Sequence, residues 1–374
     1  MNANAETADR VLILLDETQP AMAHALIRAA FERITAEGHR PVLLCVPCPS
    51  QPSHPMIDGT GPYQPWATGP FPEHAALLAT SCSTAILGAA WSAGPVHWLL
   101  GSDPFADAGE DSLDGEIAHG LMREGGVHPL ASSASLGEIL RSQHGLDASV
   151  YALVPAFPEA NAIRPDPPRP RVVIDHTSRS GESVVRAAEA IQGLDLSTVL
   201  LTDLLDPPWA SEFGEKRIRP RDRQRHYAGA TLVLKLDGFH ASLPALAAIL
   251  ASGAPLAATR DAVDALPLTH LHDAWILSSP APDPVRAEIA LLTRNRQALA
   301  SIARRGRQKY ESWRALPGGG TFRFAAAQLP APSAIRELAA AVLMRANRAA
   351  WNSTILRRLN EWYDGAAGCG EVTK

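Results

Sequence analysis

The sequence is poor in cysteine and in long apolar runs, and each shortage excludes a class of protein. Its 374 residues include four cysteines, too few for the disulfide framework of a small secreted domain. Cys45 and Cys48 have C-x-x-C spacing, but no second such pair accompanies them, so we interpret both as semi-buried thiols rather than half of a zinc site. No run of 18 uninterrupted apolar residues is present, which argues against a membrane-spanning helix.

The charge balance argues against a nucleic-acid partner. The formal net charge is -5 at pH 7, whereas affinity for nucleic acid comes largely from Lys and Arg side chains that neutralise phosphates. Residues 1–10 are polar and lack the apolar stretch of a signal peptide, so we expect a cytoplasmic protein. Peripheral association with the inner face of the membrane, or with a protein partner, stays open.

Apolar runs alternate with amphipathic stretches along the first part of the chain. The uninterrupted run at residues 11–15 predicts a buried parallel strand, and the 3.6-residue spacing that follows predicts a helix over 21–36. Further strands are predicted at 41–46, 77–80, 96–100, 127–131 and 150–154, and further helices at 83–91 and 135–144. Residues 48–74 are rich in Pro, Gly and Ser and predict a long loop.

Residues 155–170 form the clearest boundary, because their six prolines suit neither a sheet ladder nor a helix interior. The alternation then restarts, with strands predicted at 171–175, 198–203, 231–236, 255–259 and 275–277 and helices at 182–192 and 284–305. We therefore expect an N-terminal Rossmann-like domain at 1–156, a linker at 157–170 and a C-terminal Rossmann-like domain at 171–332. A helical segment at 333–374 is expected to pack back on the body.

Two α/β domains of this kind, with parallel sheets facing across a cleft, are the fold that the pattern predicts. Many enzymes share this outline. After the first predicted strand the chain has Thr18-Gln19-Pro20 in place of a glycine-rich phosphate loop, which disfavours a dinucleotide oxidoreductase.

A more specific signal lies in residues 78–105, LATSCSTAILGAAWSAGPVHWLLGSDPF. This segment resembles the GT-B glycosyltransferases of the group that includes bacterial rhamnosyltransferases, in which an A-T-S-x-x-T-A motif precedes a helix and the next strand ends in Q-D-x-E-x-x-F. The chain keeps the first motif, together with Asp103 and Phe105, but has Ser102 for the Gln and lacks the Glu. Residues 130–158 and 226–259 are similar to later segments of the same group.

The resemblance implies that the C-terminal domain binds a nucleotide-sugar donor, with basic residues after its first strand to neutralise the diphosphate. At this place only Arg179 is basic, and with Ser178 it lies in a loop whose N–H groups precede a predicted helix and suit phosphate. The alternative is a solvated turn with a surface arginine.

A second donor loop is implied within residues 226–259. Its donor-binding candidates are Lys235, Gly238 and Ser242, and His240 is a candidate catalytic residue beside the transferred sugar. Gly238 allows the backbone to approach a ligand, whereas Ser242 is equally suited to capping the helix that follows. The group usually carries a Glu for the nucleotide ribose where this chain has Ala248.

Polar residues also follow the strands predicted for the N-terminal domain, where ligands of α/β sheets bind. Asp103 is the first candidate for a catalytic group that faces the acceptor, and Asp16, Glu17 and His24 are candidate acceptor-side residues. His24 lies on an otherwise apolar helix, so a half-buried structural histidine is its alternative interpretation.

The leading expectation is a glycosyltransferase that moves a sugar from a nucleotide-sugar donor to a glycan or lipid-linked acceptor in cell-surface polysaccharide assembly. It would need neither metal nor cofactor, because side chains and a helix N-terminus neutralise the leaving diphosphate, and the resemblance implies retention of the anomeric configuration. One alternative is a degenerate glycosyltransferase-like subunit that binds a partner or glycan without turnover, as Ala248 suggests. Another is a nucleotide-sugar epimerase, although the paired carboxylates that it needs are not obvious.

Overall fold

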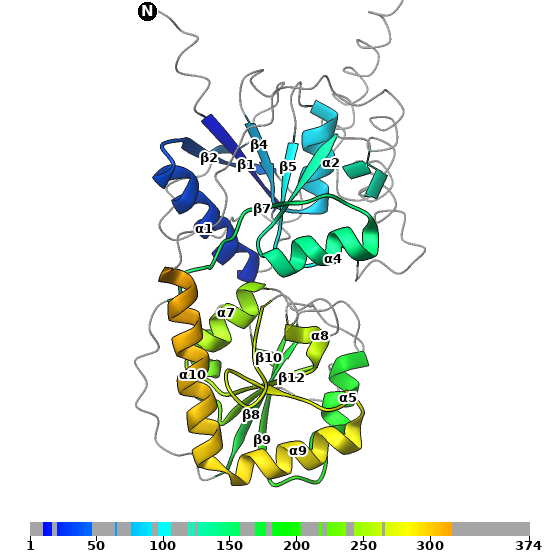
Figure 1. Ribbon diagram of the computed structural model, residues 1–374, viewed down its shortest axis with the longest axis vertical. Helices are drawn as coiled ribbons and strands as arrows, with labels where there is room; N and C mark the ends of the chain where they lie inside the picture. The colour runs from blue at the N-terminus through cyan, green and yellow to red at the C-terminus, as the bar shows by residue number, and fades with distance from the viewer. Residues whose placement is uncertain are drawn as a thin grey trace, which may run out of the picture.

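The computed structural model describes two parallel sheets and the helices that cover them (Figure 1). The described residues are 10–16, 21–46, 64–65, 76–91, 96–105, 119–120, 122–123, 126–157, 169–176, 182–202, 217–218, 223–236, 243–263 and 266–315. The predicted helical segment 333–374 and most of the linker 157–170 lie outside them.

The first sheet has seven strands in the order β3-β2-β1-β4-β5-β6-β7, all parallel. Its strands are β1 (Arg10–Asp16), β2 (Arg40–Val46), β3 (Gln64–Pro65), β4 (Ala76–Ala79), β5 (Val96–Leu100), β6 (Val127–Ala131) and β7 (Ser149–Val150). Helices α1 (Ala21–Ala36), α2 (Cys82–Trp91) and α4 (Ala134–His144) accompany it. The central strands begin and end within a residue or so of the predicted bounds.

The predicted strand at 150–154 is wrong in its extent, since β7 ends at Val150. The chain nevertheless follows the end of β6, because Tyr151 N–H donates to Ala131 O at 2.8 Å and Leu153 N–H donates to Ser132 O at 3.1 Å. The region predicted as a long loop, 48–74, contains the short edge strand β3.

The second sheet has six parallel strands in the order β10-β9-β8-β11-β12-β13. Its strands are β8 (Arg171–His176), β9 (Ser197–Thr202), β10 (Arg217–Ile218), β11 (Leu232–Lys235), β12 (Leu256–Ala258) and β13 (Trp275–Ile276). Its helices are α5 (Glu182–Ile191), α6 (Arg223–Ala228), α7 (Leu243–Ala251), α8 (Arg260–Val263), α9 (Pro282–Arg294) and α10 (Arg296–Ala315).

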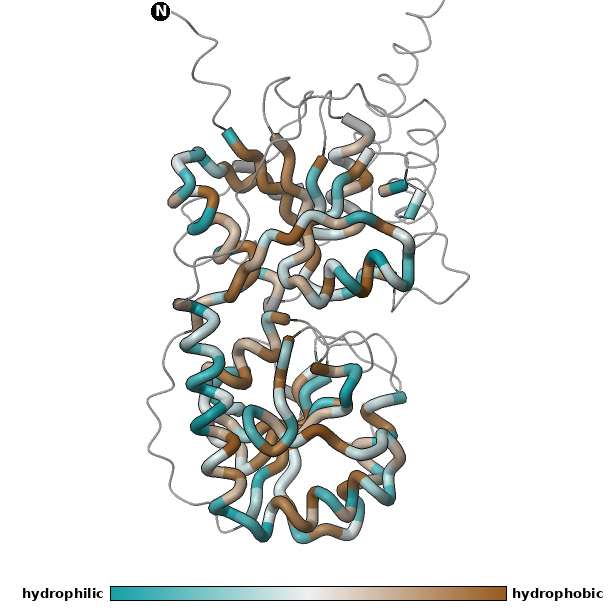
Figure 2. The backbone as a smooth tube through the Cα atoms, viewed as in Figure 1, coloured by the Kyte–Doolittle hydropathy of each residue, from teal (hydrophilic) through white to brown (hydrophobic). Residues whose placement is uncertain are grey.

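Each sheet is apolar on both faces, as expected for parallel strands covered by helices. All five residues of β5 and all four of β11 are buried. Figure 2 shows the hydrophobic strands at the centre of each half, whereas hydrophilic residues recur along α9 and α10 at the outside. Hydrophobic clusters therefore lie on both sides of each sheet, and they confirm the predicted α/β class.

The two halves face each other through a few defined contacts. Leu243 N–H, at the start of α7, donates to Gly101 O just beyond β5 at 3.1 Å. Helix α10 runs along the second half and ends beside the first (Figure 1). On this helix the Tyr310 hydroxyl donates to Pro155 O and accepts from Phe157 N–H, both at 3.0 Å. The segment that joins the halves is thus held by a helix from the second half.

Within the described residues, no helix combines the length and the apolar character that crossing a bilayer requires.

Candidate functional site

Each sheet has one point where its strand order reverses, between β1 and β4 in the first and between β8 and β11 in the second. Ligands of open α/β sheets bind beside the carboxyl ends of the strands at such a switch point. The side chains at these two places are therefore the first candidates for a functional site.

At the switch point of the second sheet, three buried polar side chains converge on the carboxylate of a fourth. Asp175, near the end of β8, accepts a hydrogen bond from Lys235 Nζ at the end of β11, 2.9 Å from its Oδ2. Its Oδ1 accepts from the Tyr227 hydroxyl at 2.6 Å and from Arg223 Nη1, both on α6. The strand register makes this contact possible, because Leu234 pairs with Ile174 and the next residues therefore lie side by side.

The four side chains together carry one net positive charge. Arg223 and Lys235 are cations, Asp175 is the shared carboxylate, and Tyr227 stays neutral because burial, and then the charge of Asp175, raise its pKa. None of the four is more than 1 % exposed. Charges act over longer distances where water is excluded than they do in solvent, so this cluster favours a negative group at the ends of β8 and β11.

Other polar side chains extend the site along the same edge of the sheet. His176 is the last residue of β8, and its Nδ1 lies 3.3 Å from the Thr202 hydroxyl at the end of β9. Thr259 directly follows β12, and all three side chains are buried. The strands are apolar in their middle and polar at their carboxyl ends, as in a ligand-binding sheet. Among the described residues, no group of three or more His, Cys, Asp or Glu side chains is arranged to hold a metal ion.

At the switch point of the first sheet, the A-T-S-x-x-T-A motif has a structural role. The Thr80 hydroxyl donates to Leu14 O at 2.6 Å and so links the end of β4 to β1. Thr84 Oγ1 accepts from the N–H groups of Thr80 and Ser81 at 3.0 and 2.9 Å, and Ser81 Oγ accepts from Thr84 N–H at 3.2 Å. These bonds cap the N-terminus of α2.

Asp103 is buried in the first half and has two partners. Its Oδ2 lies 2.9 Å from His144 Nε2 at the end of α4, and its Oδ1 accepts from Phe105 N–H at 3.0 Å. The rings of Phe105 and His144 pack with their centroids 4.6 Å apart. The sequence pattern did not point to His144, whose partnership with Asp103 depends on the fold. The catalytic role of Asp103 stays a prediction.

A pocket of about 590 Å³ lies between the two halves. Its walls come from the middle of α1, the first turn of α4, the segment 152–156, the first residue of α7, residues 266–267 and the end of α10. The pocket therefore joins the carboxyl edges of both sheets on the side where the chain crosses from one half to the other.

The remaining predicted site residues have the following places. Lys235 is fully buried against Asp175, Asp16 ends β1, and His24 is half-buried in α1. Glu17, Ser178, Arg179, Gly238, His240 and Ser242 lie outside the described residues.

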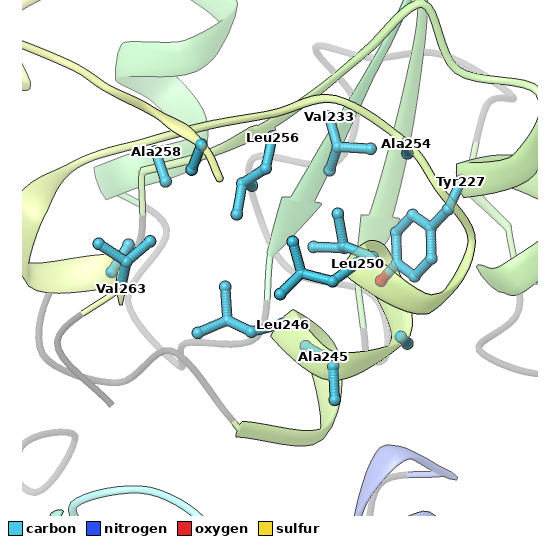
Figure 3. Close-up of a cluster of buried hydrophobic side chains, with 14 of the residues drawn as sticks. Tyr227, Val233, Ala245, Leu246, Leu250, Ala254, Leu256, Ala258 and Val263 are labelled. Carbon is cyan, nitrogen blue, oxygen red and sulfur yellow. The ribbon is translucent and has the colours of Figure 1, made fainter. Parts of the chain in front are cut away.

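Ala248 lies within the apolar core of the second half and is 0 % exposed. Figure 3 shows its helix neighbours Leu246 and Leu250 packed beside Val233 and Leu256 of the sheet. Ala248 itself belongs to the same cluster, so its methyl group fills part of the core.

Solved structures resemble this chain in fold, at low sequence identity. No family model matches the chain, and no curated protein matches it. Among solved structures, HepE of Anabaena in complex with UDP-glucose aligns with a TM-score of 0.59 and 14 % identity, over 90 % of this chain and 99 % of that chain. Sucrose-phosphate synthase of Thermosynechococcus elongatus aligns with 0.55 and 13 %, over 90 % and 99 %. A glycosyltransferase of Rickettsia africae aligns with 0.52 and 11 %, over 81 % and 93 %.

The chain has the GT-B fold. This confirms the expected architecture of two Rossmann-like halves with parallel sheets that face each other. In that architecture the Asp175 cluster occupies the switch point of the half for which the sequence predicts donor binding.

Proposed function

We propose that the protein is a glycosyltransferase that binds a nucleotide sugar at the carboxyl edge of the second sheet. The observation that carries this proposal is the pair of buried cations, Arg223 and Lys235, which meet Asp175 at the β8/β11 switch point of a GT-B fold. A likeness to HepE, which was solved with UDP-glucose, supports the same ligand class.

In the proposed reaction, the bond between the anomeric carbon of the sugar and the diphosphate oxygen breaks, and an acceptor hydroxyl oxygen bonds to that carbon. The hydroxyl proton passes to the departing diphosphate oxygen, and the nucleoside diphosphate is released. Arg223 and Lys235 oppose the negative charge that develops on the diphosphate, and they do so from a dry site where they need not reorganise. The chain thereby supplies its own positive charge, and the proposed reaction uses no metal ion.

The predicted site residues have roles within this proposal. Ser178, Arg179, Gly238 and Ser242 contact the donor directly, while Lys235 acts on it through its charge. His240 lies beside the transferred sugar. Asp103 faces the acceptor from the first half, together with Asp16, Glu17 and His24.

The domain limits belong to the same proposal. Residues 1–156 form the acceptor side, 171–332 form the donor side, and 333–374 return to pack on the body. Assembly of cell-surface polysaccharide at the inner face of the membrane, with a glycan or lipid-linked acceptor, is the setting that the rhamnosyltransferase-like motifs favour.

A second function, that of a degenerate subunit that binds a partner or glycan without turnover, is favoured by Ala248. This residue stands in the core where the resembling group carries a ribose-binding Glu. An alanine methyl group accepts no hydrogen bond, so the donor would lose one anchor in such a degenerate site.

Binding and turnover together distinguish the two functions. The full chain is first melted in the presence of UDP-, GDP- and dTDP-linked sugars, since a ligand that binds the folded state raises the melting temperature. We expect one nucleotide class to do so and to release its nucleoside diphosphate on incubation with the protein. Release of a nucleoside diphosphate would refute the second function, and no stabilisation by any of these nucleotide sugars would refute the first.

The variant Arg179→Ala, melted with the same nucleotide sugars, tests whether Arg179 contacts the donor. We expect this variant to lose about tenfold or more in affinity, as for a charge-assisted hydrogen bond to phosphate. Arg186→Ala is the matched control, because Arg186 is a partly exposed arginine of α5 that pairs with Glu182. Equal affinities of the two variants would remove Arg179 from the site.

A further inference from the structure

The pocket between the halves is lined by both apolar and polar residues. Val154, Leu243, Leu266 and Trp313 contribute apolar surface. Polar surface comes from the first turn of α4 and the residues just before it, and from Arg33 of α1 and Arg314 of α10. A ligand that fills this space therefore needs an apolar body and a polar group.

Helix α4 presents its N-terminus to the pocket. The helix is 11 residues long and begins after Ser133, whose hydroxyl accepts from Leu136 N–H at 3.1 Å. The N–H groups of Ala134 and Ser135, in its first turn, have no partner within the helix. Both residues line the pocket, so the positive end of the helix dipole faces it.

Ser132 supplies an independent observation. It is 2 % exposed and lines the pocket, and among the described residues its buried hydroxyl has no hydrogen-bond partner. The Ser132 backbone is fully engaged, since its N–H donates to Leu100 O at 3.0 Å and its carbonyl accepts from Leu153 N–H at 3.1 Å. A buried hydroxyl without a partner is costly, and an acceptor oxygen on a ligand removes that cost.

The charges in the wall favour an anion. Among the described residues of the wall, Glu32 is the acidic one, and Arg28 pairs with it at 3.2 Å. Arg33 pairs with Glu37 at 2.7 Å. Arg314 lies exposed at the end of α10 and adds a further positive charge. The five side chains together carry one net positive charge, and the α4 N-terminus adds to it.

We infer that this pocket binds an organic anion, either a phosphate monoester or a carboxylate, whose apolar body lies against Trp313 and Leu266. The negative group bonds to Ser132 and to the first turn of α4. This inference rests on the proposed function in one respect: in that function, the pocket anchors the charged and apolar end of the acceptor. The first residue of α7, Leu243, forms part of the wall, so the anchored acceptor lies next to the predicted donor loop.

Calorimetric titration of the full chain with hexyl phosphate tests the inference, with hexanoate, hexanol and inorganic phosphate as comparisons. Hexyl phosphate or hexanoate is expected to bind at least about tenfold more tightly than hexanol and inorganic phosphate, since each of these lacks one half of the recognised chemistry. The stronger of the two anions identifies the phosphate or the carboxylate as the natural group. Equal binding of hexanol, or no binding of either anion, would overturn the inference.

Ala134→Asp and Ala134→Asn form a matched pair that locates the site. Ala134 is exposed at the start of α4, where an aspartate stabilises the helix, but its charge repels an anion in the pocket. We expect the aspartate variant to lose at least about tenfold in hexyl phosphate affinity, and the asparagine variant to change about twofold or less. Ser132→Ala should lose about tenfold. Arg304→Gln, exposed on α10 away from the pocket, should bind as the parent does.

Titrations in the presence of UDP distinguish failure of this inference from failure of the proposed function. Saturating UDP should leave hexyl phosphate affinity unchanged, and Ala134→Asp should leave UDP affinity unchanged. Displacement of hexyl phosphate by UDP, or full hexyl phosphate affinity in Ala134→Asp, would place the anion elsewhere and overturn the inference. Failure of UDP to bind would instead count against the proposed function alone.

Discussion

The Lys235 ammonium lies 2.9 Å from the Asp175 carboxylate at the place where β11 and β8 run side by side, and both side chains are fully buried. A lysine of this kind requires a counter-charge, because an unpaired ammonium in the core is very costly. Asp175 supplies that counter-charge and also receives Arg223 and Tyr227. Four side chains are therefore held in one arrangement directly below the ends of the central strands.

Removing the shared carboxylate should strongly destabilise the fold. Asp175→Asn leaves Arg223 and Lys235 buried without the charge that they share, and we expect it to lower the free energy of unfolding by about 3–5 kcal/mol. Tyr227→Phe removes one neutral donor from the same carboxylate and should cost about 1 kcal/mol. Urea unfolding of both variants measures the difference. Similar losses in the two would show that the ionic contacts contribute little.

The segment that joins the two halves should depend on the Tyr310 hydroxyl for its position. Tyr310→Phe leaves Pro155 O and Phe157 N–H without their partner, and we expect a loss of about 1–3 kcal/mol in the free energy of unfolding. Ser312→Ala, exposed on the same helix, should change it by about 0.5 kcal/mol or less. Thermal unfolding of the two variants provides the comparison, and a stable Tyr310→Phe protein would contradict this role.

A carboxylate introduced in place of the Ala248 methyl group should destabilise the fold. Because its methyl group is packed in the core of the second half, Ala248→Glu buries a charge and should destabilise the fold by about 3 kcal/mol or more. Exposed Ala300, on α10, provides the control substitution Ala300→Glu, which should be tolerated. A melting curve decides between the outcomes. An unchanged melting temperature with stronger nucleotide binding would instead indicate an open ribose pocket at this position.

His97 should make the protein sensitive to acid. Burial, and then the neighbouring His128, lower its pKa from 6.5 to about 4. Between these two values the unfolded chain binds a proton that the folded chain does not, so stability is full above 6.5 and falls as the pH drops toward 4. At about pH 5 the loss should be about 2 kcal/mol.

Unfolding of the parent and of His97→Leu over this pH range measures the effect. The variant should show a flatter dependence, although His128, whose pKa burial also lowers, retains part of it. The same slope in both proteins would assign the acid sensitivity to other groups.

Much of the fold was predictable because long apolar runs and helical periodicity carry it. Helix α1 and strands β5 and β6 have the bounds that the pattern predicted. Two-residue β10 was missed, since an element this short shows no clear period. Strand β7 was predicted too long, because the residues after it are apolar but bond along the end of β6 without forming a ladder.

The site was predictable only in part. Asp175 and Lys235 stand out in the sequence as charged residues at the ends of apolar strands, and this is the signal of a buried pair. Lys235 was predicted to be a loop residue that contacts the donor, whereas the structure buries it against Asp175. Arg223 follows Asp175 by 48 residues, and only the fold brings the two together.

Calorimetric titration of the full chain with UDP and with uridine shows whether positive charge at the β8/β11 switch point holds a nucleoside diphosphate. We expect UDP to bind at least about tenfold more tightly than uridine, and added salt to reduce this difference in affinity, because charges on the diphosphate supply it. If GDP or dTDP proves to be the better ligand, guanosine or thymidine is the matching comparison. Equal binding of the diphosphate and its nucleoside for every base, or no binding of any of them, would contradict the account.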